Sequence, residues 1–296
     1  MLIDKIPVIR GWLARFRNHK AKTTQLNLYS TMIKRIKETP ISSIHFDSNG
    51  CVYTLDDGRS FHFNPEKSAG WLYTVPYTGT FEQKETEFVR RAVQSDFVCI
   101  DIGACFGWYS VLLSHVVGER GQVHSFEPVP DNRECLLTNL ALNHASNVKV
   151  NTFALGDKEC STKIYVPMDG VSGSLKAHAK LEDCKILEIN VSTLDKYVTD
   201  NELNRIDFIK ADIEGAEFLM LKGAEFTLRK YRPILMLEVQ AHSTKLFGYV
   251  PEDLFEWLKK IGYKAYYVNA SYELVKYNNS LDQSELPDYN FIFKFG

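Results

Sequence analysis

Residues 97–110, Phe-Val-Cys-Ile-Asp-Ile-Gly-Ala-Cys-Phe-Gly-Trp-Tyr-Ser, constrain the fold more than any other stretch of the sequence. The stretch opens on apolar and β-branched residues, passes through two glycines four positions apart, and then restarts an apolar pattern with helical spacing. This order predicts a strand, a tight turn and a helix. Because such a turn directs unpaired backbone N–H groups into a crevice at the end of the strand, we expect a nucleotide-like ligand there.

A regular alternation of strands and helices surrounds this turn. A helix over 82–94 leads into the opening strand. The later predicted strands cover 122–126, 148–153, 206–211, 233–239, 263–268 and 290–295, and the later helices cover 131–143, 215–230 and 251–260. This alternation predicts an α/β fold with a mostly parallel sheet and helices on both faces. The last two strands have no helix between them, so the last one should run antiparallel.

Residues 160–198 interrupt this alternation. Two short strand patterns, at 163–166 and 186–191, flank a polar loop around 170–173. We expect this insertion and the N-terminal segment to shape a substrate pocket.

The first 78 residues form an N-terminal extension to a main domain at 79–296. Residues 2–16 and 28–36 show helical spacing of apolar residues, and the first segment also carries basic residues and Trp12. Three alternating runs between 41 and 64, separated by turn-forming residues, predict a small β-meander. The basic region 1–40 suits contact with an anionic membrane surface, but equally packing on the chain itself or on a second copy in an oligomer.

Charge is unevenly distributed along the chain. Residues 1–40 hold nine Lys or Arg and two acidic residues, a balance of +7, and the rest carries −9 because the whole chain carries −2. A main domain with a net negative charge does not suit contacts with phosphates, so we do not expect nucleic acid as a partner. The sequence shows neither a signal-peptide pattern nor a run of about 18 apolar residues. Its six cysteines include no C-x-x-C pair, so we expect reduced thiols and a cytoplasmic protein, with peripheral membrane contact left open.

Four polar elements follow successive predicted strands and converge on one ligand site. Asp101, Gly103 and Gly107 form the first, and Glu127 follows the next strand, 20 residues beyond the second glycine. An acidic side chain in that place accepts hydrogen bonds from both hydroxyls of a ribose. The third element, 154–157, ends on an acid that suits an adenine amino group, and the fourth is 212–217.

Two classes of cofactor contain the ribose and adenine that these elements suit. A nicotinamide-dinucleotide oxidoreductase also places a glycine turn and an acid about 20 residues apart, but its G-x-G-x-x-G pattern approaches a pyrophosphate. The wider spacing from Gly103 to Gly107 better suits S-adenosylmethionine, which has no phosphate. The oxidoreductase remains an alternative, as does a non-catalytic scaffold on the same fold.

The sequence resembles the FkbM-type methyltransferases, class I S-adenosylmethionine-dependent enzymes that mostly methylate hydroxyl oxygens. The resemblance covers roughly residues 79–296 and is most specific at 209–217, Ile-Lys-Ala-Asp-Ile-Glu-Gly-Ala-Glu, and at 221–224, Leu-Lys-Gly-Ala. It includes 101–110, although Cys105 and Trp108 replace the Asn and Tyr of the family's turn. The resemblance implies a Rossmann-like sheet, S-adenosylmethionine as cofactor, and a hydroxyl of a sugar, glycan or glycolipid as acceptor.

The resemblance also implies roles for individual residues. Residues 103–107 surround the methionine part of the cofactor, Glu127 binds its ribose, Asp157 its adenine, and Glu85 its amino group. The full set of expected cofactor-binding residues is Glu85, Asp101, Gly103, Ala104, Gly107, Phe126, Glu127, Pro128, Ala154, Asp157 and Asp212.

Methyl transfer to oxygen requires an aligned acceptor and a base that removes its proton. Asp212 and His242 are the two candidates for this base, and Glu214 and Glu238 are expected to position the acceptor hydroxyls. In an alternative, Asp212, Glu238 and His242 bind a divalent metal ion that acidifies a sugar hydroxyl.

Overall fold

The computed structural model of the chain describes residues 27, 30–31, 33–34, 37–48, 50–63, 79–167, 173–177, 181–278 and 289–296. The basic segment at 2–16 lies outside these residues, so both of its predicted roles stay predictions. The described positions between 27 and 38 are helical. In this described part of the chain, no helix combines the length and the apolar character needed to cross a bilayer.

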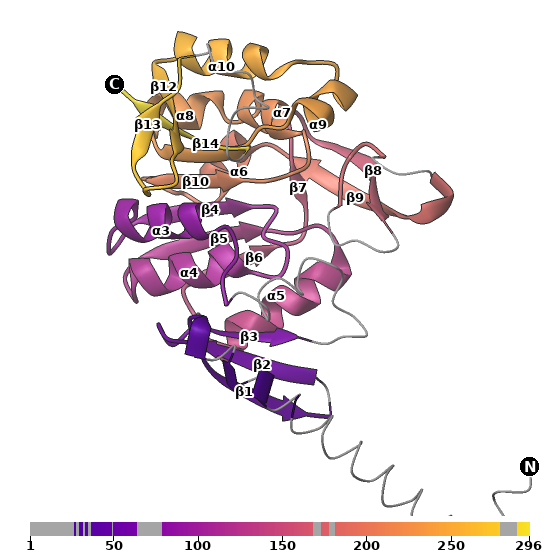
Figure 1. Cartoon of the computed structure of the whole chain (residues 1–296). Coiled ribbons are helices and arrows are strands. Elements are labelled where there is room, and N and C mark those ends of the chain that lie inside the picture. The colour runs from indigo at the N-terminus through magenta and orange to yellow at the C-terminus, as the bar shows by residue number, and fades with distance from the viewer. Residues whose placement is uncertain are drawn as a thin grey trace, which may run out of the picture.

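An eight-stranded sheet forms the centre of the molecule (Figure 1). In sheet order its strands are β13 (Leu274–Lys276), β12 (Tyr263–Val268), β14 (Asn290–Phe295), β11 (Ile234–Glu238), β10 (Phe208–Ala211), β4 (Val98–Ile102), β5 (Gln122–Phe126) and β6 (Val148–Asn151). The strands from β11 to β6 pair in parallel, whereas β14 is antiparallel to both neighbours, as predicted. The strand order reverses between β4 and β10, the place where sheets of this kind bind ligands.

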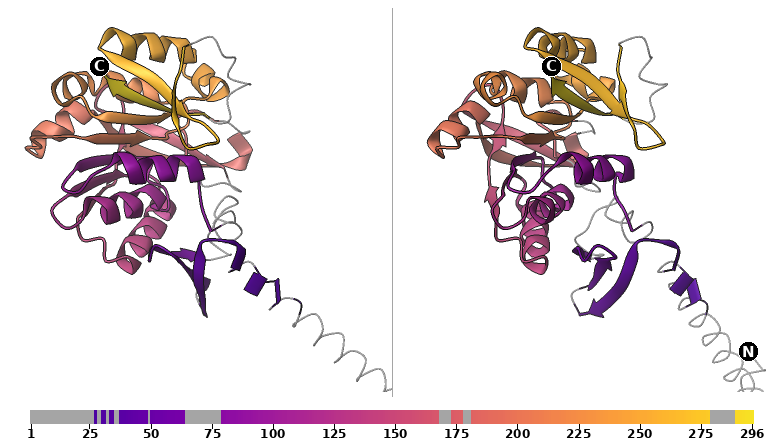
Figure 2. Two further views of the ribbon diagram at one scale, coloured as in Figure 1. Left: turned by 60° about the vertical axis from the view of Figure 1, so that its left-hand side comes forward. Right: turned by 90° about the vertical axis from the view of Figure 1, so that its left-hand side faces the viewer.

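Helices cover both faces of this sheet (Figure 2). On one face lie α3 (Gln83–Ala92), α4 (Trp108–Val117) and α5 (Pro130–Leu142), and on the other α6 (Leu194–Asp200), α7 (Glu217–Lys222), α8 (Glu225–Tyr231) and α10 (Pro251–Lys260). Strand side chains alternate between the two cores: Cys99 packs with the first set of helices and Ile100 with the second. Because both faces are buried, the central strands β4, β10 and β11 are mostly apolar rather than alternating, with Asp101 and Lys210 as charged exceptions inside β4 and β10. The class I methyltransferase-like α/β sheet predicted from the sequence is therefore confirmed.

The predicted β-meander is also confirmed. It consists of β1 (Ile41–Asp47), β2 (Gly50–Leu55) and β3 (Ser60–Phe63), paired antiparallel. Phe61 stacks on Trp108 of α4 with ring centroids 4.8 Å apart, and both belong to the core on that face of the main sheet. The meander thus shares a core with the main sheet, and a domain boundary at residue 78 stays a prediction.

Two amide side chains, Asn139 of α5 and Asn143 directly after its end, pair with the outer edge of β3. Asn143 Oδ1 accepts the Ser60 N–H at 2.8 Å, and Asn139 Oδ1 accepts the His62 N–H at 2.8 Å. Residues four apart lie on one face of a helix, while alternate residues of a strand direct their N–H groups to one edge. The two amides therefore satisfy the backbone of an edge strand as a further strand would.

The insertion forms a smaller sheet of β7 (Ala154–Leu155), β9 (Cys184–Ser192) and β8 (Cys160–Pro167). β8 and β9 form a long antiparallel pair, and β9 runs parallel to β7. Both strands are longer than the sequence patterns predicted. Figure 1 shows β8 and β9 projecting on the side of the molecule to which the parallel strands of the main sheet point.

One predicted helix is wrong in its extent. The pattern at 215–230 is two helices, α7 and α8, which separate at Gly223. A Cβ at Gly223 would lie 2.0 Å from the backbone oxygen of Gly156, so the close approach of these two loops fixes the break. The strand β13 was not predicted, because its three residues carry too short a pattern.

Candidate functional site

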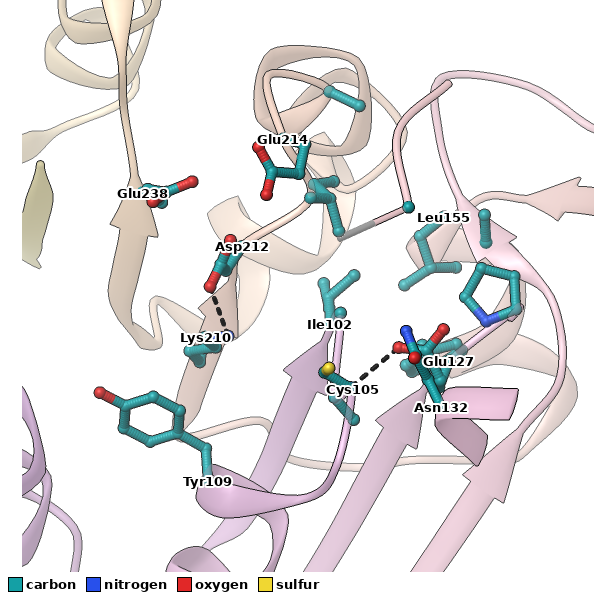
Figure 3. Close-up of a pocket in the computed structure, with 18 of the residues that line it drawn as sticks. Ile102, Cys105, Tyr109, Glu127, Asn132, Leu155, Lys210, Asp212, Glu214 and Glu238 are labelled. Carbon is teal, nitrogen blue, oxygen red and sulfur yellow. Dashed lines mark hydrogen bonds and ion pairs between the residues drawn. The ribbon is translucent and has the colours of Figure 1, made fainter. Parts of the chain in front are cut away.

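A cavity of about 230 Å³ opens at the carboxyl ends of β4, β5, β10 and β11 (Figure 3). It lies where the strand order reverses. Figure 3 shows Glu127 and Asn132 on one side, Tyr109 and Lys210 on the other, and Cys105 between them. One cavity therefore joins the glycine turn to the carboxyl ends of β10 and β11.

The glycine turn reaches the cavity through its backbone. Gly103 has a φ of +78°, and a Cβ there would lie 2.0 Å from the backbone oxygen of Asp212. No other residue type fits such a position without displacing the chain. Cys105 also adopts a left-handed conformation, with φ of +50°, although it bears a side chain. The turn is thus held in one strained shape between β4 and α4.

Glu127 is fixed by the backbone around it. Its carboxylate accepts the N–H groups of Cys105 and Val129, each at 2.8 Å, and the side chain is 3% exposed. Burial raises the pKa of Glu127 to about 7, although these two N–H groups and the Asn132 side chain oppose the rise. A carboxylate offers about four lone-pair sites, so three donors leave Glu127 able to accept a hydrogen bond from a ligand.

A polar cluster lines the opposite end of the cavity. The Lys210 Nζ atom lies 3.3 Å from Asp212 Oδ2 and 5.1 Å from the centre of the Tyr109 ring. Lys210 is only 4% exposed. Burial lowers its pKa, but the charges of Asp212, Asp101 and Glu82 outweigh that effect and raise it overall. Lys210 is therefore a buried ammonium that stabilises the negative charges around it.

Glu238 and Glu214 complete this end of the cavity wall. Glu238 ends β11, and its Oε1 atom accepts the Gln240 side-chain N–H at 2.6 Å. Burial raises the pKa of Glu238 well above its usual range, and the charges of Asp212 and Glu214 add to this. Two neighbouring carboxyl groups thus lie in different surroundings: Glu238 is partly buried beside the Gln240 amide, and Asp212 pairs with the Lys210 ammonium.

The insertion supplies an apolar part of the wall. Ile164 of β8 and Leu175 line the cavity together with Leu155. Ser174 Oγ donates to the backbone oxygen of Glu214 at 3.2 Å, which ties the insertion to the loop after β10. The expected contribution of this segment to a pocket is therefore visible in the structure, although its substrate role stays a prediction.

The structure brings most of the predicted site residues together. The cavity wall contains Gly103, Ala104, Phe126, Glu127, Pro128, Ala154, Asp212, Glu214 and Glu238. Their individual binding and catalytic roles stay predictions.

Three predicted cofactor residues are buried or held elsewhere and do not line the cavity. Glu85 is 2% exposed on α3. Asp101 is fully buried behind the turn, where it accepts the Ser110 hydroxyl at 2.6 Å. A Cβ at Gly107 would lie 2.7 Å from the Leu136 side chain, so this glycine faces α5. The latter two residues shape the turn from behind.

Asp157 and His242 also lie outside the wall, on the surface. Asp157 is exposed in the loop after β7. His242 is exposed on α9 (Ala241–Leu246), where its Nε2 atom lies 3.2 Å from Ser243 Oγ. Across the described ranges, no three His, Cys, Asp or Glu side chains are arranged to hold a metal ion. The alternative metal site is thus not assembled in this part of the chain, where His242 is exposed on α9 and does not line the cavity with Asp212 and Glu238.

The sequence interpretation missed Glu82, Tyr109, Asn132 and Lys210, which all line the cavity. Lys210 had a visible signal, since it is a lone charge inside an apolar strand, two residues before Asp212 and therefore on the same face. Asn132 had a weaker one, because it lies in the first turn of the helix that follows Glu127.

A family model for the methyltransferase FkbM domain matches residues 101–265, which is more than half of the chain. The protein "Methyltransferase 1" of Beauveria bassiana is 22% identical over 179 residues, which cover 50% of this chain and 71% of that protein.

Two solved structures that match the chain have lower sequence identity to it. Methyltransferase FkbM from Methylobacillus flagellatus KT is 19% identical with a TM-score of 0.43, and the match covers 75% of this chain and 52% of that one. The chain thus spans about half the length of that solved protein. An O-methyltransferase from Bacillus cereus, solved in complex with SAH, is 12% identical with a TM-score of 0.43, and the match covers 73% of this chain and 82% of that one.

Proposed function

The chain belongs to the FkbM methyltransferase family, and we propose that it transfers a methyl group from S-adenosylmethionine to a hydroxyl oxygen of a carbohydrate or glycolipid. Family membership supports methyl transfer over the dinucleotide oxidation and the non-catalytic scaffold considered from the sequence. The single observation that carries the proposal is the cavity that joins Glu127 to the Lys210–Asp212 pair across the glycine turn.

The residues of this cavity fit S-adenosylmethionine. Glu127 has acceptor capacity for a ribose hydroxyl, in a wall otherwise formed there by Pro128, Ala154 and Leu155. No phosphate-binding cation stands at this end, since Lys210 is the one Lys or Arg among the described wall residues. When bound, this cofactor supplies a methyl group that is electrophilic because its sulfur is positively charged.

The polar end of the cavity supplies the groups that the acceptor needs. Asp212 is placed to remove the hydroxyl proton, because its carboxylate lies in the wall and the Lys210 ammonium stabilises its charge. Glu238 lies in the same wall, where its carboxyl group can form a hydrogen bond with the acceptor. The apolar side chains of Phe81 and Ile213 lie in the same wall and exclude water. A positioned base contributes roughly 10²- to 10⁴-fold to such a step.

The charge of this end favours an uncharged acceptor. Four carboxyl groups, those of Glu82, Asp212, Glu214 and Glu238, line it against the single Lys210. A phosphate or carboxylate near the reacting oxygen would be repelled, whereas the hydroxyls of a neutral sugar can pair with several carboxyl oxygens. This supports a sugar acceptor and argues against nucleic acid.

Two measurements test the proposed function. Isothermal titration calorimetry of the wild-type chain should show binding of both S-adenosylmethionine and its demethylated product SAH, and Glu127→Ala should abolish it. Incubation with methyl-labelled S-adenosylmethionine and an extract of the source cell should then yield a labelled methyl ether on a sugar. Absence of binding by the wild type, or label only on nitrogen or protein, would contradict the proposal.

A further inference from the structure

Glu82 has a conformation and a partner that a merely structural acid does not need. It directly precedes α3 with φ of +44°, a left-handed conformation uncommon outside glycine. Its Oε2 atom accepts the Tyr109 hydroxyl at 2.6 Å, and both residues line the cavity. Backbone strain of this kind persists where the surrounding structure holds a side chain in a required place. Here it turns the Glu82 carboxylate toward the cavity.

The charges around Glu82 leave room for a cation. The Lys210 ammonium lies 3.3 Å from Asp212 and is paired with it. Tyr109 contributes a neutral donor only. Glu82 thus accepts its hydrogen bond from a hydroxyl, while the Lys210 charge acts on it from the ion pair with Asp212. Burial raises the pKa of Glu82 to about 7, and the charge of Asp212 adds to the rise, although Lys210 and the Tyr109 hydrogen bond oppose it. A bound cation would therefore offset a remaining cost of ionisation.

The position of Glu82 indicates which cation this is. Glu127, proposed to bind the ribose, lies on the other side of Cys105 from Tyr109, the partner of Glu82 (Figure 3). A ligand that reaches from the ribose across the glycine turn brings its opposite end to Tyr109 and Glu82. In S-adenosylmethionine that end is an amino acid, which carries an ammonium group.

We infer that Glu82 binds the α-ammonium group of the methionine part of the cofactor. This inference rests on the proposed use of S-adenosylmethionine. It replaces Glu85, three residues further on, whose side chain is buried in α3 and does not line the cavity.

Two ligands distinguish binding of the α-ammonium group by Glu82 from a general effect of the substitution on the site. SAH contains the amino acid, whereas 5′-methylthioadenosine shares the adenosine and thioether but lacks it. Calorimetry with both ligands on the wild type, Glu82→Gln and Glu85→Gln requires no acceptor and no turnover. Gln keeps the size of Glu and still accepts the Tyr109 hydroxyl, and thermal unfolding of each variant checks that it is folded.

Glu82→Gln should bind SAH at least tenfold more weakly than the wild type, the effect of one lost hydrogen bond to a charged group. It should bind 5′-methylthioadenosine within about twofold of the wild type, and Glu85→Gln should bind both ligands as the wild type does. Equal loss of both ligands in Glu82→Gln, unchanged SAH binding, or a selective loss of SAH in Glu85→Gln would overturn the inference. Failure of the wild type to bind SAH would instead overturn the proposed function.

Discussion

Replacing Asn139 by Ala should weaken both the fold and the cofactor site, because this one side chain connects three elements. Asn139 is 1% exposed on α5. Its Oδ1 accepts the His62 N–H of β3 at 2.8 Å, and its Nδ2 donates to the Phe106 carbonyl of the glycine turn at 2.7 Å. The meander, the helix and the turn are therefore joined through a single buried amide.

The expected loss follows from the two backbone groups that Ala would leave unpaired. Each buried polar group without a partner costs about 1–3 kcal/mol, so Asn139→Ala should lower the free energy of unfolding by about 2–6 kcal/mol. Asn143, which directly follows the end of α5, provides a matched control, since it bonds to the Ser60 N–H and carbonyl but is partly exposed. Water can replace those bonds, so Asn143→Ala should cost only about 1 kcal/mol.

Urea unfolding followed by circular dichroism measures both losses, and calorimetry with SAH measures the effect on the site. Because Phe106 belongs to the turn, Asn139→Ala should bind SAH more weakly by roughly three- to tenfold, equivalent to about 0.7–1.4 kcal/mol. Asn143→Ala should bind SAH as the wild type does. Equal stability losses in the two variants, or unchanged SAH affinity in a destabilised Asn139→Ala, would refute the proposed connection.

Three further predictions concern the site and the start of α7, which follows the loop after β10. Gly103→Ala should fail to fold or melt well below the wild type, since the left-handed backbone costs about 1–2 kcal/mol and the new Cβ would lie 2.0 Å from a backbone oxygen; a wild-type melting temperature would show that the turn can relax. Asp212→Asn should bind SAH normally and lose at least about 100-fold in methyl-transfer rate, and retained turnover would place the base elsewhere. Burial raises the pKa of Glu217 from 4.5 to about 8, so the folded state keeps a proton that the unfolded state releases. Stability should therefore fall as pH rises through this interval, and Glu217→Gln should flatten that slope in urea titrations at pH 5 and 8; an unchanged slope would contradict the assignment.

Much of the fold was predictable because its signals are local. The spacing of apolar residues gives strands and helices directly, and the missing helix before residue 290 implies the antiparallel β14. Glu127 and Asp212 were found because the carboxyl ends of neighbouring parallel strands meet at one edge of the sheet. The tight turn was also predicted, because Gly103 and Gly107 lie between a strand pattern and a helix pattern. The left-handed conformation of Cys105 was not predicted.

Local pattern alone did not decide which way several side chains face. His242 follows Glu238 closely in sequence, yet α9 carries it to the surface. Asp157 follows a strand as Glu127 does, but it is exposed in the loop that leads into the insertion. Such outcomes depend on where one segment packs against another that is distant in sequence, and no spacing rule contains that information.

The sequence by itself determined the mostly parallel sheet, the glycine turn after β4, and Glu127, the acid at the end of the neighbouring strand β5. Only the tertiary structure decided which acid before the turn reaches the cavity. α3 begins at Gln83, so Glu85 lies within the helix and is buried, while Glu82 precedes it and is turned toward Tyr109. A helix boundary is uncertain by a few residues in any sequence pattern, and a shift of that size changes which side chain a ligand meets.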